Sequence, residues 1–313
     1  MVPIVSVDPL PFTNERHMKV LITGSRGYIG RNLQKLFDSQ GIDYRGIDIM
    51  TPDSVEGFHE SPYVDERQYD APRGVMDVST LGELLDLCQP DVVVHLAAFK
   101  SAPRSIKEPV SCYDLNVGGI TNLMMSGVKR MIFTSSAAVY GDTDEVVDES
   151  ASVDGQPTTP YGHSKVMGEQ ILHDCGCEGS ILRLFNVGGG SCPDKGGNLF
   201  PRIASSLMRD ERMTVFHGER DYVHVDDVCR AILLACKDQS DGLHTYNICT
   251  GIGTSAHKIA DQFPDLKQTK SGYRDGDPVR IVGNNGKAVE HLLWSPTKTV
   301  SDMVADVEGW VHD

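Results

Sequence analysis

Short apolar runs alternate with amphipathic segments over the first 185 residues of the chain. Runs rich in β-branched residues indicate buried parallel strands, and apolar positions three and four apart indicate helices that pack on them. This alternation predicts an α/β fold with a doubly wound parallel sheet and helices on both faces. The expected strands cover residues 20–22, 44–49, 74–76, 91–96, 131–134 and 181–185, and the polar stretches at 51–73 and 142–160 are expected to be loops.

The first expected strand ends in a loop that contains Gly24, Gly27 and Gly30. A helix follows, because Ile29 and Leu33 begin an apolar stripe at helical spacing. A strand, a glycine loop and a helix together point backbone N–H groups and the positive end of the helix dipole at one place, which suits a pyrophosphate. The G-x-x-G-x-x-G spacing alone is a weak signal, since such turns also serve packing.

An acidic residue supports a dinucleotide as the ligand. Asp48 lies 24 residues after Gly24, near the end of the second expected strand, where its carboxylate would accept both ribose hydroxyls of an adenosine. Ala97 and Ala98 follow the next apolar strand, and such small residues let a backbone approach a flat ligand closely. The amide of Asn116, inside an expected helix, is either a cofactor contact or a buried hydrogen-bonding group.

Tyr161 and Lys165 stand four residues apart at the start of another expected helix, so their side chains project from one face. A free tyrosine, with a pKa near ~10, is a poor base at neutral pH. A nearby ammonium and the positive charge of a nicotinamide would favour the phenolate. Ser136, which follows the expected strand at 131–134, would hydrogen-bond the same substrate oxygen.

The strand and helix alternation breaks after Asn186, at the glycine run 188–190, and the chain then returns to the sheet with a helix at 226–237 and a strand at 245–248. We therefore expect two domains. The dinucleotide-binding domain would comprise residues 18–186 and 223–249, and a smaller α/β substrate-binding domain would comprise residues 187–222 and 250–313. Residues 1–17 are expected to be an N-terminal extension without chemistry, either packed on the body or preceding an alternative start at Met18.

Composition narrows the possible partners. The 313 residues are 40% hydrophobic and 23% charged, which is enough for one large α/β domain with a smaller one attached. The net charge of −15 argues against nucleic acid or an anionic membrane, because both attract a basic surface. No apolar run approaches the roughly 18 to 20 residues of a membrane span, and residues 1–17 do not resemble a secretory signal.

Eight cysteines are scattered through the chain, and no N-x-S/T sequon is present, so a reducing cytoplasm is the expected location. His173, Cys175 and Cys177 form an H-x-C-x-C cluster. No second pair completes a tetrahedral ligand set, so we expect free thiols and no metal.

A series of motifs extends in order from residue 18 to beyond residue 290: T-G-S-R-G-Y-I-G, D-V at 77–78, H-L-A-A-F-K, N-V at 116–117, F-T-S-S-A-A-V-Y-G, P-Y-G-H-S-K, L-R-L-F-N, G-N-L-F-P, R-D-Y-V-H-V-D-D-V and Y-R-D-G-D-P. In these motifs the chain resembles the extended short-chain dehydrogenase/reductase family, which has a Rossmann fold. Within that family it is similar to the nucleotide-sugar 4-epimerases that act on UDP-glucose and UDP-galactose. The resemblance implies an NAD cofactor and a homodimer formed through the helices expected at 114–128 and 161–174.

The resemblance also implies a role for each matching residue. Tyr161 would be the acid/base on the sugar 4-hydroxyl, Ser136 its hydrogen-bonding partner, and Lys165 the cofactor-ribose contact that tunes Tyr161. The other implied cofactor contacts are Gly24, Arg26, Gly27, Tyr28, Ile29, Gly30, Asp48, Asp77, Val78, Leu96, Ala97, Ala98, Lys100 and Asn116. The other implied substrate contacts are Lys100, Ala137, Asn186, Asn198, Leu199, Phe216, Arg220, Arg274 and Asp277.

Arginines at a diphosphate make chemical sense, because a guanidinium fork matches phosphate oxygens. Arg274 on its own would equally suit a surface ion pair. The segment between Phe216 and Arg220 is shorter than in typical 4-epimerases, so the loop near the base is trimmed. Arg26 in the glycine loop would suit the 2′-phosphate of NADP, whereas Asp48 would repel that phosphate and favours NAD.

The implied reaction is epimerisation at C4 of a nucleotide-diphosphate sugar through a transient 4-keto intermediate. Two alternatives stay open: an NADP-dependent reductase of nucleotide 4-keto sugars, which Arg26 favours, and a non-catalytic dinucleotide sensor. Retention of Ser136, Tyr161 and Lys165 argues against the sensor. Dehydratases of the family carry an acid and a base just after the catalytic serine or threonine, where this chain has Ala137 and Ala138.

Overall fold

A computed structural model describes residues 18–49, 68–71, 74–76, 78–190, 198–273 and 278–312. A seven-stranded parallel sheet is its centre, in the order β11-β7-β5-β4-β1-β2-β3. The strands are β1 (Lys19–Thr23), β2 (Asp43–Ile49), β3 (Gln68–Ala71), β4 (Val92–His95), β5 (Arg130–Ser136), β7 (Glu178–Leu184) and β11 (Leu243–Ile248). The apolar runs that predicted strands form the middle of this sheet, where both faces are covered.

Helices cover both faces of the sheet. On one face, α1 (Tyr28–Gln40) and α8 (Val225–Lys237) share a core with strands β1 and β4. On the other face, α2 (Val78–Cys88), α5 (Gly119–Met125) and α6 (Pro160–Asp174) bury Leu84, Ile120 and Leu172. The doubly wound fold predicted from the sequence is therefore confirmed.

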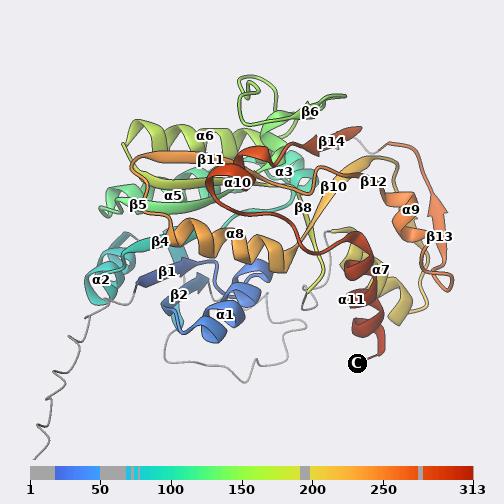
Figure 1. Cartoon of the computed structure of the whole chain (residues 1–313), viewed down its shortest axis with the longest axis horizontal. Coiled ribbons are helices and arrows are strands. Elements are labelled where there is room, and N and C mark those ends of the chain that lie inside the picture. Colours follow the sequence, from blue (N-terminus) through green and yellow to red (C-terminus); the bar gives the residue numbers. More distant parts are fainter. Residues whose placement is uncertain are drawn as a thin grey trace, which may run out of the picture.

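A smaller region packs beside the sheet and holds the C-terminus (Figure 1). Its strands are β6 (Val146–Val147), β8 (Asn186–Gly188), β9 (Met213–Val215), β10 (Glu219–His224), β12 (Gly253–Ser255), β13 (Gln268–Lys270) and β14 (Arg280–Gly283). Its helices are α7 (Leu199–Met208), α9 (Ala256–Ala260) and α11 (Val300–His312), which share a separate apolar core around Phe200, Ile259 and Met303. The helix α10 (Gly286–His291) returns to the central sheet beside β11.

Three expectations were wrong in detail. Residues Gly74–Met76 form a 3₁₀ turn rather than a strand, because Val75 is buried under α5 instead of pairing in the sheet. The strand at that edge is β3, inside the expected loop at 51–73, where backbone pairing with β2 takes the place of an apolar pattern. The expected loop at 142–160 contains the short strand β6, which pairs with β14.

The helix expected at 114–128 begins earlier than predicted. The turn α3 (Ala102–Lys107) leads into α4 (Pro109–Tyr113), a π-helical turn (Asp114–Gly118) and α5, which run on without a break. Asn116 lies in the π-helical turn and is buried.

Candidate active site

The glycine loop between β1 and α1 has the shape of a phosphate-binding turn. Gly24 has φ of 71°, and a Cβ at this position would lie 2.6 Å from the backbone nitrogen of Ala97. A Cβ on Gly30 would overlap the backbone of Ser25. Gly27 precedes α1 and has no side chain to cap it, so the first N–H groups of this 13-residue helix point into the loop.

Asp48 lies directly beside this loop. Its carboxylate accepts a hydrogen bond from the backbone N–H of Arg26 at 2.8 Å, and the Arg26 carbonyl accepts one from the Arg31 side chain at 3.0 Å. Ile29 packs against the core beneath α1, and the Tyr28 hydroxyl donates to the Gly189 carbonyl at 2.5 Å. The loop and the acid are thus brought together at the carboxyl ends of β1 and β2, as a dinucleotide requires.

The segment after β4 closes the other side of the loop. The backbone nitrogens of Leu96 and Ala97 hydrogen-bond Thr23, at 3.0 Å to its carbonyl and 3.3 Å to its hydroxyl. Ala98 is half-buried, Lys100 is exposed, and Val78 at the start of α2 is 40% exposed. Asp77 lies outside the described residues.

Asn116 holds this segment in place. Its side-chain oxygen accepts from the Phe99 nitrogen at 2.7 Å, and its amide donates to the Phe99 carbonyl at 3.2 Å and to the Ser164 hydroxyl at 2.8 Å. The amide therefore joins the loop after β4 to helix α6, and the contact of Asn116 with a cofactor stays a prediction.

Ser136, Tyr161 and Lys165 meet at the carboxyl end of β5. Thr159 caps α6 by accepting from the Gly162 nitrogen at 3.3 Å, and the ammonium of Lys165 donates to the Thr134 carbonyl at 2.9 Å. That ammonium lies 6.0 Å from the centre of the Tyr161 ring. The helix can approach this closely because Gly162 lies against the carbonyl of Ala138, where a Cβ would be 2.7 Å away.

The surroundings shift both titrating groups. Burial raises the pKa of the Tyr161 phenol, while its hydrogen bond with Ser136 lowers it. Burial lowers the pKa of Lys165 to about 8, although Cys112 and Glu169 nearby favour the charged form. The phenol is thus protonated at rest, and added positive charge beside it would favour the phenolate.

The predicted substrate residues lie on the smaller region and at its junction with the sheet. Ala137 is buried in the turn after Ser136, and Asn186 begins β8 opposite Tyr222 of β10. Asn198 donates to the Val187 carbonyl at 3.4 Å and precedes α7, whose first residue is Leu199. Phe216 follows β9.

Arg220 stands on β10, where its guanidinium donates to the carbonyls of Glu219 at 3.1 Å and Val279 at 3.3 Å. Arg274 and Asp277 lie outside the described residues.

A buried ion pair next to Ser136, Tyr161 and Lys165 was not anticipated. Glu169 and Arg183 contact each other at 2.7 Å, and both side chains are 7% exposed. One signal for it is present in the sequence, because Glu169 follows Lys165 by four residues and so lies on the same face of α6.

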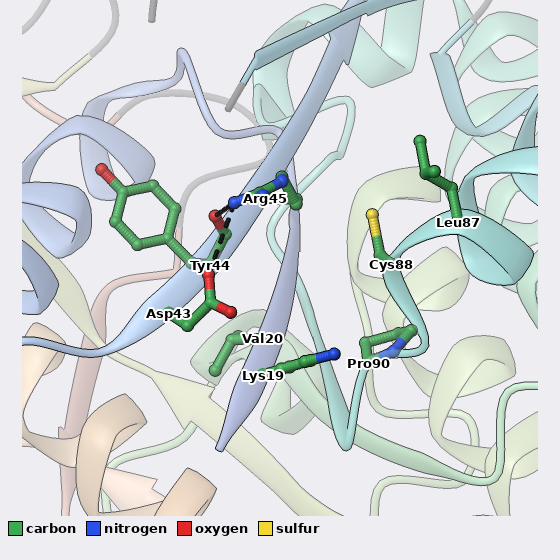
Figure 2. Close-up of a pocket in the computed structure, with 8 residues that line it drawn as sticks. All are labelled: Lys19, Val20, Asp43, Tyr44, Arg45, Leu87, Cys88 and Pro90. Carbon is green, nitrogen blue, oxygen red and sulfur yellow. Dashed lines mark hydrogen bonds and ion pairs between the residues drawn. The ribbon is translucent and has the colours of Figure 1, made fainter. Parts of the chain in front are cut away.

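A hollow elsewhere in the molecule is not part of this site. It is lined by Lys19, Val20, Asp43, Tyr44, Arg45, Leu87, Cys88 and Pro90 (Figure 2). Lys19 and Asp43 are the first residues of β1 and β2, so the hollow lies at the amino edge of the sheet. Ligands of open parallel sheets bind at the opposite, carboxyl edge.

At the carboxyl edge of the sheet, the geometry suits a dinucleotide beside a tyrosine that can act as an acid/base. Comparison with known proteins agrees: the model of the NAD dependent epimerase/dehydratase family matches residues 20–249. The chain belongs to this family, which confirms the family prediction made from the motifs.

Relatives match over nearly the whole chain. The UDP-glucose 4-epimerases of Yersinia enterocolitica and Lactobacillus helveticus are each 30% identical, and each alignment covers 94% of this chain and 97% of the relative. A solved UDP-glucose-4-epimerase from Stenotrophomonas maltophila, with bound NAD and formylated UDP-arabinopyranose, has a TM-score of 0.80 and 28% identity over 95% of this chain and 98% of its own. One from Bifidobacterium longum, in complex with NAD+ and UDP, has a TM-score of 0.81 and 26% identity over 94% and 98%.

Proposed function

We propose that this protein is an NAD-dependent 4-epimerase of nucleotide-diphosphate sugars of the UDP-glucose and UDP-galactose type. The observation that carries the proposal is the meeting of Ser136, Tyr161 and Lys165 beside the glycine loop and Asp48, in a chain whose relatives are UDP-glucose 4-epimerases. The relatives' solved structures hold NAD with UDP or a UDP-sugar, which suits the two halves of this site.

The residues present fit NAD. The glycine loop leaves the space that a Cβ would fill, the first N–H groups of α1 favour a pyrophosphate, and Asp48 would accept the adenosine ribose hydroxyls. Lys165 would hold the nicotinamide ribose. When bound, NAD supplies a hydride acceptor and a positive charge beside Tyr161.

In the proposed reaction, Tyr161 takes the proton of the sugar 4-hydroxyl while Ser136 hydrogen-bonds the same oxygen. The hydride leaves C4 at this step, so the sugar becomes a 4-keto intermediate. This intermediate turns about its link to the diphosphate, which Arg220 and Asn198 would hold. Hydride then returns to the opposite face, and Tyr161 gives the proton back, so that no net redox change occurs.

The residues present do not suit the two rival reactions: a dehydratase would lack its acid/base pair, and a reductase that uses NADP would meet a repelling carboxylate. Ala137 is buried and Ala138 forms part of the same 3₁₀ turn, so no acid/base pair follows Ser136, as a dehydratase needs. An NADP-dependent reductase would place a 2′-phosphate near Arg26, but the Asp48 carboxylate is fixed beside that residue and would repel the phosphate. NAD is therefore favoured.

The test has two parts. The protein is denatured to identify the released dinucleotide, and native protein is incubated with UDP-galactose without added cofactor. We expect bound NAD and formation of UDP-glucose. Tyr161→Phe should slow this formation about 10²- to 10⁴-fold, whereas Tyr44→Phe, at the amino end of β2, should preserve it. NADP(H), with consumption of NADPH on a 4-keto sugar and no interconversion, would support the reductase.

Assembly and location follow as further parts of the proposal. We propose a homodimer in which helices at 114–128 and 161–174 pair. Val110, shortly before the first of these helices, is 80% exposed, Met125 is 73% exposed and Met167 is 45% exposed, so pairing would cover apolar side chains. Among the described helices, none is both long and apolar enough to cross a membrane. The seven cysteines that the structure describes are free, which suits a reducing cytoplasm.

The domain division also remains a proposal. Residues 18–186 with 223–249 would bind NAD, and residues 187–222 with 250–313 would bind the nucleotide sugar. The separate apolar core around α7, α9 and α11 supports this division.

A further inference from the structure

The buried ion pair between Glu169 and Arg183 lies directly behind the catalytic trio. Both oxygens of the carboxylate are engaged: Oε2 contacts Arg183 Nη2 at 2.7 Å, and Oε1 accepts from Arg183 Nε at 3.1 Å. The pair therefore joins helix α6 to strand β7 in a fixed, two-point geometry.

Two further hydrogen bonds extend the pair to both sides of Ser136. The Ser135 hydroxyl donates to Glu169 Oε1 at 2.5 Å, and Arg183 Nη1 donates to the Tyr140 hydroxyl at 2.9 Å. Ser135 is the residue before Ser136, and Tyr140 ends the 3₁₀ turn that Ser136 caps by accepting from the Ala138 nitrogen at 3.2 Å. The ion pair thus fixes the backbone on each side of the catalytic serine.

Glu169 also acts on the helix that carries the other two catalytic groups. It lies one helical turn after Lys165, whose ammonium donates to the Thr134 carbonyl. Successive turns of α6 therefore hold successive residues of β5, Thr134 and Ser135. This double attachment sets the position of the Tyr161 end of α6 against the end of β5.

Tyr140 forms the outer end of the network. Its hydroxyl donates to the side-chain oxygen of Asn247 at 2.7 Å, and burial raises its pKa to about 12, so the hydroxyl keeps its proton and can accept from Arg183 as well. Asn247 in turn donates to the carbonyls of Val147 and Asn284. Glu169, Arg183, Tyr140 and Asn247 each have more than one partner, which makes the network rigid.

Stability alone does not explain such a pair, because well-packed apolar residues stabilise a protein core at least as well as a buried ion pair. We propose that Glu169 and Arg183 are positioning residues that hold the Ser136 hydroxyl against the Tyr161 phenol. The kinetic part of this inference rests on the proposed function.

Ser135→Ala and Tyr140→Phe test the inference without breaking the ion pair, since each removes one hydroxyl link to it. In the double variant we expect kcat for UDP-galactose to fall about 10- to 100-fold, with KM changed less than about twofold, because misplacement affects the reacting groups more than binding. Tyr44→Phe is the matched control, since Tyr44 lies at the amino end of β2 and its hydroxyl donates to Asp38 of α1, away from the carboxyl edge of the sheet. If the double variant kept the wild-type kcat, or if KM rose as much as kcat fell, the inference would be overturned.

A second measurement does not depend on the reaction. The pKa of Tyr161 is read from tyrosinate absorbance, as the difference between each protein and its Tyr161→Phe counterpart. Because the hydrogen bond with Ser136 lowers the Tyr161 pKa, the double variant should titrate at a higher pH than wild type. If the Tyr161 pKa were the same in the double variant and wild type, the positioning role would be contradicted, even if wild type proved to act on another sugar. If the Tyr161 pKa rose in the double variant but wild type left UDP-galactose unchanged, only the proposed function would be contradicted.

Discussion

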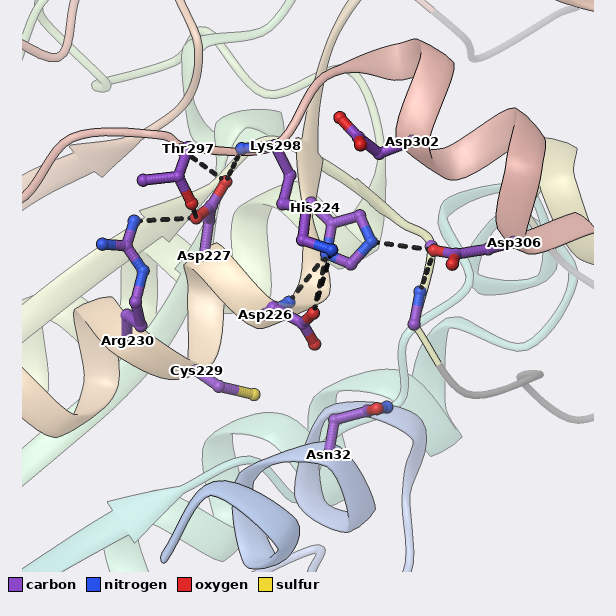
Figure 3. A network of polar contacts seen from close by, with 12 residues as sticks. Asn32, His224, Asp226, Asp227, Cys229, Arg230, Thr297, Lys298, Asp302 and Asp306 are labelled. Atoms are coloured by element: carbon purple, nitrogen blue, oxygen red, sulfur yellow. Dashed lines mark hydrogen bonds and ion pairs between the residues drawn. The ribbon is translucent and has the colours of Figure 1, made fainter. Parts of the chain in front are cut away.

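Two buried polar clusters hold this molecule together in different ways. In the Glu169 cluster (Ser135, Tyr140, Glu169 and Arg183), side chains hydrogen-bond to one another, and they come from β5, β7, α6 and the 3₁₀ turn after β5. In the second cluster, around His224 and Asp227, side chains mainly accept from loop backbone where the chain passes between the sheets (Figure 3).

The second cluster fixes turns rather than reacting groups. Asp306 of α11 accepts from the Gly190 nitrogen at 2.6 Å and lies 2.8 Å from Nε2 of the buried His224. Asp227, fully buried at the start of α8, accepts from the nitrogens of Thr297 at 3.0 Å and Lys298 at 2.9 Å. We therefore expect changes in the Glu169 cluster to affect mainly kcat. Changes in the second cluster, the His224 cluster, should affect mainly the free energy of unfolding and the KM for the substrate.

The largest effect is expected where the Glu169 cluster acts, at Tyr161. Tyr161→Phe should lower kcat about 10²- to 10⁴-fold, because it removes the proposed acid/base. In this background Ser135→Ala should lower kcat less than it does in wild type, since only the contact of Ser136 with the substrate oxygen is left to position. Interconversion of UDP-galactose and UDP-glucose measures both, and an equal loss in the two backgrounds would show that the cluster does not act through Tyr161.

The next effect is the stability cost of a buried ammonium. The fall of the Lys165 pKa from 10.5 to about 8 corresponds to about 3 kcal/mol. Between these pH values the unfolded chain keeps a proton that the folded chain has released, so the stability of wild type rises with pH through this window.

Lys165→Met should therefore be more stable than wild type at pH 7, by up to about 3 kcal/mol, and this advantage should shrink between pH 8 and about 10.5. Its kcat should fall as well. Denaturant unfolding at several pH values measures the difference, and an advantage that did not depend on pH would contradict the buried ammonium.

A smaller effect is expected from the His224 cluster. Asp306→Asn keeps the shape of the side chain and one oxygen for Gly190 and His224, which already share Oδ2, but it removes the negative charge that strengthens both hydrogen bonds. We expect a loss of about 1–3 kcal/mol in the free energy of unfolding. The KM for the nucleotide sugar should rise, because Asn186 and Asn198 are attached to the same turn through β8, while kcat stays within about twofold. A fall in kcat at constant KM would contradict the claim that only the Glu169 cluster acts on the chemical step.

The smallest effect belongs to the control. Tyr44→Phe removes one hydrogen bond to Asp38 and should cost about 0.5–1.5 kcal/mol of stability, with kcat and KM unchanged. A change in kcat here would mean that kinetic changes elsewhere report general loosening of the sheet.

The sequence predicted the features that rest on local patterns. Apolar runs identified the buried strands, glycine spacing located the turn between β1 and α1, and the four-residue spacing of Tyr161 and Lys165 placed both on one face of a helix. The edge strand β3 was missed because it forms by backbone pairing, without an apolar pattern. Val75 was assigned to a strand because burial under a helix produces the same apolar signal.

The support of the site is less visible in sequence. Glu169, Arg183 and Tyr140 are distant from one another along the chain, and only the crossing of β5, β7 and α6 brings them together. The hydrogen bonds of Asn116 likewise depend on Phe99 and Ser164, which only the fold places beside it. Long-range contacts of this kind depend on the whole topology, which no local spacing records.

The central claim is a reversible transfer of hydride at C4 within one active site. The most direct measurement uses UDP-galactose that carries deuterium at C4, with purified protein and no added cofactor, and locates the isotope in the product by NMR. We expect UDP-glucose that retains the deuterium at C4. Loss of deuterium to solvent, or the absence of UDP-glucose, would contradict it.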